Sequence, residues 1–219
     1  MVRRFLVTGV VVVLMGLVYG CGQEATPGGG QTPGGTETPA VRAGTETVKP
    51  PEAPPAAPVQ PVDPKVTVLL DFEDGKNPFT VDEDFKDKVE MVVVNDPDHA
   101  TSGTRSLKVT LKPHEWPGIH TTDLPADWSG YESLTMDILV LQDFDLNIRI
   151  DDVNSADYET RFNSPPQPVF KGKNTITVYL SDVGQFVDLK KVKGLYVFSS
   201  NVESPLTFYV DRIRLEKKK

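Results

Sequence analysis

Short runs of alternating or β-branched apolar residues recur through residues 66–215, roughly every ten residues, with turn-forming residues between them. Such runs are typical of β-strands, because successive side chains of a strand point to opposite faces. Only the segment "DVGQFVDLKKVK" has room for one or two turns of helix. Closely spaced strands without intervening amphipathic helices predict an all-β fold, an antiparallel β-sandwich. The expected strands are 66–73, 88–95, 105–111, 118–122, 133–140, 146–151, 158–163, 174–180, 194–200 and 208–215.

The alternation within these runs predicts which side chains form the core. Apolar residues occupy every second position, which places them together on one face of each strand. The same rule places Tyr158, Thr160 and Phe162 on one face of the 158–163 run. The other predicted core residues are Leu134, Met136, Ile138, Val140, Leu146, Ile148, Ile150, Ile176, Val178, Leu180, Leu195 and Val197.

The opposite faces of these strands gather Asp, Asn, Arg, Thr and Tyr rather than the Lys and Glu expected on a sheet face meant only for solvent. Such a face suits a sugar, because sugar hydroxyls need amide, carboxylate or guanidinium partners and sugar C–H faces stack on aromatic rings. A solvated face with cross-strand ion pairs explains the same residues, for example if Arg149 pairs with Asp137 or Glu159. The pattern leaves both interpretations open.

The start of the chain has the plan of an export signal. Arg3 and Arg4 precede an apolar stretch over residues 5–18. That stretch is shorter than a permanent transmembrane helix, which needs about 20 apolar residues. The sequence therefore predicts a signal segment over residues 1–20.

Cys21 is the only cysteine of the chain, and it follows the apolar stretch directly. The sequence "VYGC" at residues 18–21 resembles a bacterial lipobox, which implies that Cys21 becomes the mature N-terminus and carries acyl chains such as palmitate. The alternative is an ordinary signal or anchor helix with an incidental cysteine. Gly22, rather than Asp, follows the cysteine. The resemblance thus implies a lipid anchor in the cell envelope, at the outer membrane or cell surface.

Composition divides the rest of the chain into two parts. Residues 21–64 are rich in Pro, Gly and Thr and contain no aromatic residue, so we expect a disordered linker. Residues 65–219 hold the strand pattern and are long enough for one domain with its own core. The formal net charge of the chain is −8, which argues against nucleic acid as a partner because phosphate binding needs clustered Lys and Arg.

Four phrases occur in an order that is typical of one group of folds: "LLDFED", "ATSGTRSLKVTL", "DWSGYESLTMDILV" and "FYVDRIRL". Together they resemble carbohydrate-binding modules of the galactose-binding-like jelly-roll type, over about residues 66–215. The complex I intermediate-associated protein family shares the "W-x-G-Y-x-x-L-x-x-D" wording. The resemblance implies a jelly-roll sandwich that binds a polysaccharide or another glycan. It also implies that Trp128 packs beneath the turn that precedes a strand.

The resemblance further implies a structural calcium ion where the first and last strands meet. Its acidic ligands would be Glu73 and Asp211, and further oxygens would come from Asp71, Ser102 or Thr104. Calcium binds several oxygen ligands at once, and carbonyl oxygens are among them. The alternative is that Asp211 caps a strand or pairs with Arg105.

A sugar surface is the second site that the resemblance implies, on the sheet face or at one rim. The predicted ligand-binding residues are Trp116, Arg149, Asp151, Arg161, Tyr179 and Tyr196. Trp116 stands in "HEWPGIHT", where it is either an exposed stacking platform or a lid on one end of the core.

No enzyme motif accompanies these residues. His99, His114 and His120 have no spacing known from zinc sites, and the chain lacks the G-x-S-x-G and H-E-x-x-H patterns. Acidic residues at 71–74 and 151–152 leave a glycoside hydrolase as a lesser alternative. The sequence therefore predicts a lipid-anchored, non-catalytic carbohydrate-binding protein. The other alternative is an envelope protein that uses the same sandwich to bind a protein partner.

Overall fold

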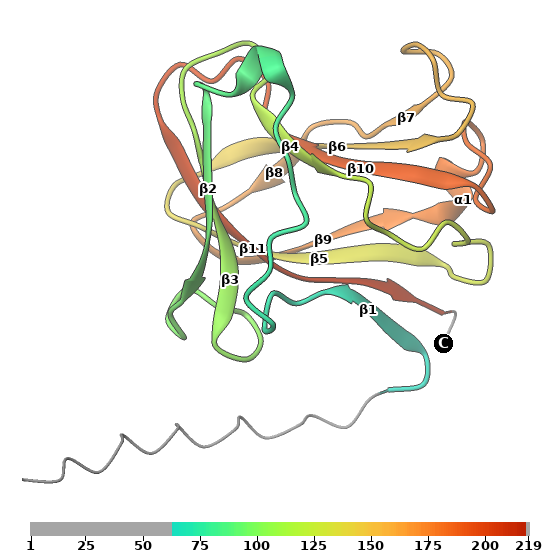
Figure 1. The fold of residues 1–219 in the computed structure, drawn as a ribbon, viewed down its shortest axis with the longest axis horizontal. Helices are drawn as coiled ribbons and strands as arrows, with labels where there is room; N and C mark the ends of the chain where they lie inside the picture. The colour runs from blue at the N-terminus through green and yellow to red at the C-terminus, as the bar shows by residue number, and fades with distance from the viewer. Residues whose placement is uncertain (1–62, 218–219) are drawn as a thin grey trace, which may run out of the picture. The chain divides into compact units, whose positions relative to one another are not determined.

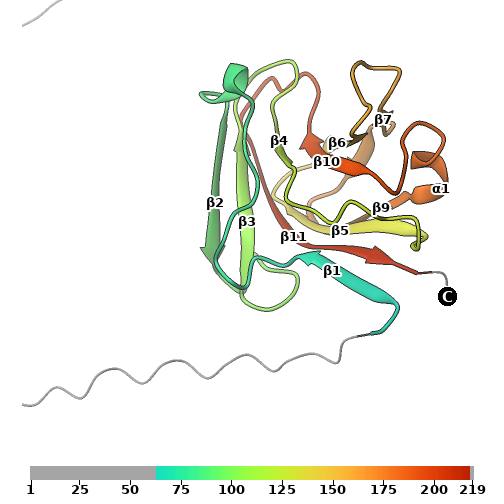
Figure 2. The same ribbon diagram turned by 45° about the vertical axis from the view of Figure 1, so that its right-hand side comes forward.

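The computed structural model describes residues 63–217 and shows two antiparallel β-sheets packed on one another (Figures 1 and 2). The predicted all-β sandwich is therefore confirmed. The predicted signal peptide, Cys21 and nearly all of the predicted linker lie outside the described residues. Within residues 63–217, no helix has the length and apolar character needed to cross a membrane.

Strands are the main elements of the described chain and make up nearly half of it. The only helical elements among the described residues are a 3₁₀ turn, η1 (Glu83–Phe85), and a single α-helical turn, α1 (Leu180–Val183). The strands are β1 (Val66–Leu70), β2 (Val89–Asn95), β3 (Arg105–Leu111), β4 (Gly118–Thr121), β5 (Ser133–Val140), β6 (Phe144–Asp152), β7 (Phe162–Asn163), β8 (Gln167–Val169), β9 (Gly172–Tyr179), β10 (Val192–Phe198) and β11 (Leu206–Glu216).

Sheet A has the strand order β2-β3-β11-β5-β9, and β1 also pairs with β11. Along one edge of β11, residues 206–210 pair with β3 and residues 213–216 pair with β1. The pairing of β11 with β5 shifts register between Asp211 and Arg214, and Arg212 there has a positive φ of 43°. This β-bulge lies between the part of β11 that pairs with β3 and the part that pairs with β1.

Sheet B has the strand order β4-β10-β6-β7, and β8 also pairs with β6. Tyr196 of β10 lies opposite His120 of β4 on one side and opposite Arg149 of β6 on the other. Arg149 in turn lies opposite Asn163 of β7. One row of side chains thus crosses the four strands, on the face of sheet B that points away from the core.

The predicted core is confirmed. Every core residue predicted from β5, β6, β9 and β10 is buried between the two sheets, and Leu146, Ile148 and Ile150 of β6 have no exposed surface. Trp128 is also fully buried, and its Nε1 donates a hydrogen bond to the carbonyl of Pro125 at 2.7 Å. Trp128 therefore has the structural role that the resemblance implies.

The prediction for residues 158–163 is wrong in its first part. Only Phe162 and Asn163 are strand, and Tyr158 and Thr160, which the alternation places in the core, are both exposed, Tyr158 by 70%. Residues 153–161 form a loop because the side chains of Asp157 and Thr160 bind the backbone N–H groups that a strand would pair. Strand β8, within the predicted connector after β7, was missed.

Candidate functional site

A groove of about 350 Å³ lies on the outer face of sheet B. Its floor is the cross-strand row of His120, Tyr196, Arg149 and Asn163. A volume of this size is in the range of small-ligand sites, which start at about 300 Å³. The remaining lining residues are Asp82, Phe85, Trp116, Gly118, Ile119, Tyr158, Arg161 and Phe198.

Tyr196 is held in the centre of the floor by its two neighbours. The His120 ring stacks on it at a centroid distance of 4.9 Å, and the Arg149 guanidinium lies 4.1 Å from its ring centroid. Burial raises the pKa of the Tyr196 hydroxyl, and the positive charge of Arg149 opposes this only in part. The hydroxyl therefore stays protonated at neutral pH and can both donate and accept a hydrogen bond.

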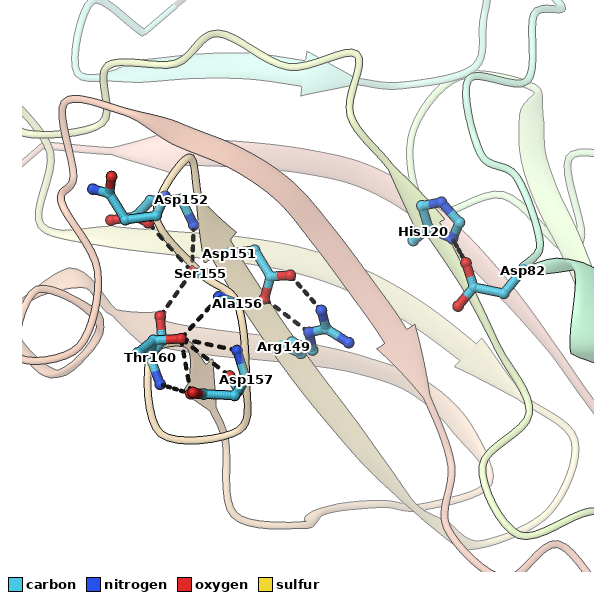
Figure 3. Close-up of polar contacts among 10 residues, drawn as sticks. Asp82, His120, Arg149, Asp151, Asp152, Ser155, Ala156, Asp157 and Thr160 are labelled. Atoms are coloured by element: carbon cyan, nitrogen blue, oxygen red, sulfur yellow. Dashed lines mark hydrogen bonds and ion pairs between the residues drawn. The ribbon is translucent and has the colours of Figure 1, made fainter.

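Arg149 is fixed by Asp151, which follows two residues later on the same face of β6 (Figure 3). Its Nε donates to Asp151 Oδ1 at 2.8 Å, and its Nη2 donates to Oδ2 of the same carboxylate. Burial alone would lower the pKa of Arg149, but the hydrogen bonds and charge of Asp151 raise it. Because Asp151 is buried, its role is to hold the Arg149 guanidinium in place beneath the groove.

Aromatic side chains line the end of the groove near the start of β4. Trp116 is 51% exposed, and its ring lies 6.1 Å from that of Phe198 on β10. Gly118 lies opposite Phe198, and a Cβ atom at Gly118 would come within 2.4 Å of the Phe198 Cβ. Position 118 therefore requires glycine if Phe198 is to pack beside Trp116. About half of the Trp116 side chain stays exposed and is open to a ligand.

The segment before η1 forms a polar wall beside β4. Thr80 and His120 exchange both backbone hydrogen bonds, at 2.7 and 2.9 Å, so this segment runs alongside β4. The His120 ring places Nε2 at 3.0 Å from Thr80 Oγ1 and Nδ1 at 3.4 Å from Asp82 Oδ1 (Figure 3). Both ring nitrogens thus face the wall, and the ring face is left for stacking on Tyr196.

The loop of residues 153–161 forms the opposite end and is ordered by its own side chains (Figure 3). Asp157 Oδ1 accepts from the Thr160 backbone N–H and hydroxyl, both at 3.0 Å, while Thr160 Oγ1 accepts from Ala156 N–H at 2.9 Å. Asp152 Oδ1 accepts from Asn154 N–H at 2.7 Å at the start of the loop. These bonds fix the backbone on both sides of Tyr158, which projects beside the groove.

Four of the predicted ligand-binding residues come together in this groove: Trp116, Arg149, Arg161 and Tyr196. Asp151 is next to it, as the partner of Arg149. Tyr179 does not join them, because this residue is at the end of β9 in sheet A, 56% exposed and away from the groove, so its role in binding stays a prediction.

Sequence reasoning missed several groove residues. His120, Asn163 and Phe198 could have been found from strand alternation, because each neighbours a core residue in its strand. Asp82, Phe85 and Tyr158 carried no such signal, since they come from segments outside the sheets.

The predicted metal ligands Glu73 and Asp211 both reach the loop of residues 101–105, but they meet N–H donors there. Glu73 Oε1 accepts from Thr104 N–H at 2.8 Å and from Arg105 N–H at 2.7 Å. The Arg105 guanidinium donates to the Glu73 carbonyl oxygen. A cation at this position would need the oxygen lone pairs that these donors occupy.

Asp211 is fully buried and is bound in the same way. Its Oδ2 accepts from Thr101 N–H at 2.7 Å, Thr101 hydroxyl at 2.9 Å and Ser102 N–H at 2.9 Å, and its Oδ1 accepts from Arg212 N–H at 2.7 Å. Burial raises the pKa of Asp211, and these donors offset the effect in part. Asp71, for its part, accepts only from the Glu73 N–H, at 3.2 Å.

The carboxylate oxygens of Glu73 and Asp211 are thus placed to accept hydrogen bonds from amide N–H groups rather than to bind a calcium ion. Among residues 63–217 there is also no group of three or more His, Cys, Asp or Glu side chains that could hold a metal. Calcium binding stays a prediction of the family resemblance, because a bound ion would have to displace the N–H groups of Thr101, Ser102, Thr104 and Arg105.

Comparison with known proteins supports the fold. No family model and no curated protein matches the chain. A family 11 carbohydrate-binding module from Clostridium thermocellum, solved with a β-1,3-1,4-mixed-linked tetrasaccharide, aligns over 68% of this chain and 95% of its own, with a TM-score of 0.53 and 16% identity. An exo-β-agarase aligns over 69% of this chain with a TM-score of 0.57 and 15% identity, but the match spans only 25% of the agarase.

Proposed function

We propose that this protein binds a polysaccharide without cleaving it, and that the groove on sheet B is the binding site. The observation that carries the proposal is the preformed row of His120, Tyr196, Arg149 and Asn163, whose polar groups lie between exposed aromatic rings. The likeness in fold to a module solved with a tetrasaccharide supports it.

The groove has the two kinds of contact that a sugar chain needs. Trp116 precedes β4 and Tyr158 precedes β7, the two edge strands of this row, and both rings are more than half exposed. Between them, the groups on the floor are fixed by ion pairing and stacking before a ligand arrives. A sugar chain that crosses the strands would stack at the ends and bond to polar groups in the middle, at little cost in ordering the protein.

Three of the acidic residues at 71–74 and 151–152 are engaged within the protein, which supports binding rather than catalysis. Asp151 is ion-paired with Arg149, and Glu73 binds the N–H groups of the 101–105 loop. Burial alone would raise the pKa of Asp152, but N–H donors from Asp188 and Asn154 outweigh it and lower the pKa. A general acid needs a raised pKa, so Asp152 is suited to holding the loop.

Replacing Trp116 with alanine tests the site. Loss of an exposed stacking ring is expected to weaken binding about tenfold, which corresponds to about 1.4 kcal/mol. Retardation in gels that contain single polysaccharides measures this affinity. Tyr179→Ala is the matched control, because Tyr179 is exposed to a similar degree but stands in sheet A. If the Trp116→Ala variant binds every retarding polysaccharide as tightly as the unchanged protein does, this groove is not the binding site.

We further propose that Cys21 carries the lipid that holds the protein at the envelope, as the lipobox-like sequence suggests. A Cys21→Ser variant is then expected to move from the membrane fraction to the soluble fraction and to lose incorporation of labelled palmitate. A variant that keeps both the label and the membrane association would contradict the anchor.

A further inference from the structure

We propose that the groove selects anionic glycans, and that Arg161 pairs with a carboxylate or sulfate group on the sugar. This inference rests on the proposed function and adds the class of ligand to it. Among the described residues, the groove contains one exposed carboxylate, Asp82, which faces the His120 ring. It also contains two arginines, Arg149 and Arg161, which differ in how their charges are balanced.

The charge of Arg149 is already balanced inside the protein. Asp151 accepts two hydrogen bonds from its guanidinium, and the Tyr196 ring covers one face of it. Arg149 can still donate to a sugar hydroxyl, but it carries no net charge to offer to a ligand.

Arg161 has no such partner. Within residues 63–217, no carboxylate is within ion-pair distance of its guanidinium, and its buried Nε has no hydrogen-bond acceptor. Its guanidinium lies 5.9 Å from the centroid of the exposed Tyr158 ring. A half-buried guanidinium without a counter-charge is costly, and an anion that binds its accessible N–H groups would relieve that cost.

Two acids shortly precede Arg161: Glu159 makes no ion pair with it, and Asp157 is already engaged. The pKa of Asp157 is lowered chiefly by the hydrogen bonds from the Thr160 hydroxyl and N–H, and the charge of Arg161 is the smallest of the causes. Asp157 thus stabilises the loop turn and leaves the charge of Arg161 available. The same turn fixes the backbone just before Arg161, so its position is set before binding.

The chemistry of guanidinium favours an oxyanion here. A carboxylate or sulfate can accept two parallel N–H bonds and also neutralises the charge, whereas a sugar hydroxyl satisfies a donor and leaves the charge unbalanced. The chain as a whole has a net charge of −8, so it would repel a polyanion in the absence of a specific site. Binding of an anionic glycan would therefore report on the groove rather than on general attraction.

Two matched pairs of polysaccharides test this: polygalacturonate against its methyl ester, and κ-carrageenan against its desulfated form. The intact chain is expected to bind the charged member of one pair at least about tenfold more tightly than the neutral member. The first pair identifies a carboxylate as the recognised group, and the second a sulfate. In Arg161→Gln the ratio of charged to neutral affinity is expected to fall to about one. Arg161→Lys keeps the charge but not the paired N–H donors of the guanidinium, and it is expected to retain part of the ratio.

Trp116→Ala separates failure of this inference from failure of the proposed function. Its affinity is expected to fall for both members of a pair, with their ratio unchanged. Equal binding of charged and neutral members, lost in Trp116→Ala, would overturn the anion preference and leave the sugar groove standing. A charged-over-neutral ratio that survives Arg161→Gln would overturn the role of Arg161. Absence of binding to all four polysaccharides, with retardation by some other neutral polysaccharide that is lost in Trp116→Ala, would overturn the anion preference and leave the sugar groove standing.

Discussion

Replacing Asp211 with alanine is expected to lower the melting temperature by roughly 6–12 °C, from a loss of about 3 kcal/mol in the free energy of unfolding. Asp211 has no exposed surface, and its carboxylate accepts hydrogen bonds from Thr101, Ser102 and Arg212. Alanine would leave these donors buried without acceptors. It would also release the loop before β3, whose Thr101 and Ser102 are held to β11 by Asp211. Thermal denaturation followed by circular dichroism measures the effect.

Three comparisons sharpen this test. Asp98→Ala removes an exposed carboxylate from the neighbouring loop and is expected to leave the melting temperature unchanged. Because burial raises the pKa of Asp211, the folded chain holds this proton to a higher pH than the unfolded chain. The contribution of Asp211 to stability should therefore decrease as the pH rises above the ordinary value of 3.8, and Asp211→Asn should remove that decrease. A melting temperature of Asp211→Ala within about 2 °C of the unchanged protein would refute the structural role.

Chelation separates the amide arrangement from a calcium site. With N–H and hydroxyl donors around Glu73 and Asp211, addition of EDTA should leave the melting temperature of the unchanged protein where it was. A fall on chelation that is absent from Asp211→Ala would instead establish the calcium ion that the family resemblance implies.

Replacing Arg149 with alanine is expected to weaken glycan binding about 30- to 100-fold, or about 2–3 kcal/mol. The change removes charge-assisted donors from the centre of the floor and the group that covers the Tyr196 ring. It also leaves the buried Asp151 carboxylate without its partner, so the floor would rearrange. Isothermal titration with an oligosaccharide of the retarding polysaccharide measures the loss.

Arg214→Ala is the matched control for Arg149→Ala. Arg214 is a second largely buried arginine with carboxylate partners, since it bonds to Asp137 at 3.0 Å and to Glu216 at 2.8 Å, but it is in sheet A. Its loss should cost stability of the same order without weakening binding. If both variants lose affinity equally, the effect of Arg149→Ala comes from unfolding and the central role of Arg149 is refuted.

The ion pairs show what strand alternation can and cannot predict. Alternation correctly placed Arg149 on the outer face of its strand, but neither predicted partner, Asp137 or Glu159, is the one observed. Asp137 is on β5 in sheet A, where it binds Arg214, while Arg149 is on β6 in sheet B. Periodicity fixes the face of a residue within its strand, whereas the choice of sheet depends on long-range pairing that no local pattern records.

The same limit explains Tyr179 and Tyr158. Tyr179 has the outward orientation that the alternation predicts, but β9 belongs to the sheet that lacks the groove. Tyr158 lies in a segment that alternates as a strand would, yet the Asp157 and Thr160 side chains compete for its backbone donors and turn the segment into a loop. Hydrophobic periodicity placed the core residues of the regular strands correctly, whereas the 158–161 segment and the groove also needed topology and loop chemistry.

Strand β11 has a consequence for how the chain can be made. It comes last among the described strands, yet it pairs with β1, β3 and β5, and Val66 finds its partner in Glu216. A polypeptide leaves the ribosome from its N-terminus, so sheet A cannot close until this segment has emerged. Strands β1 and β3 each pair with β11 but not with each other. Translation that stops before Leu206 would therefore yield a product without its middle strand, and not a slightly shortened sandwich.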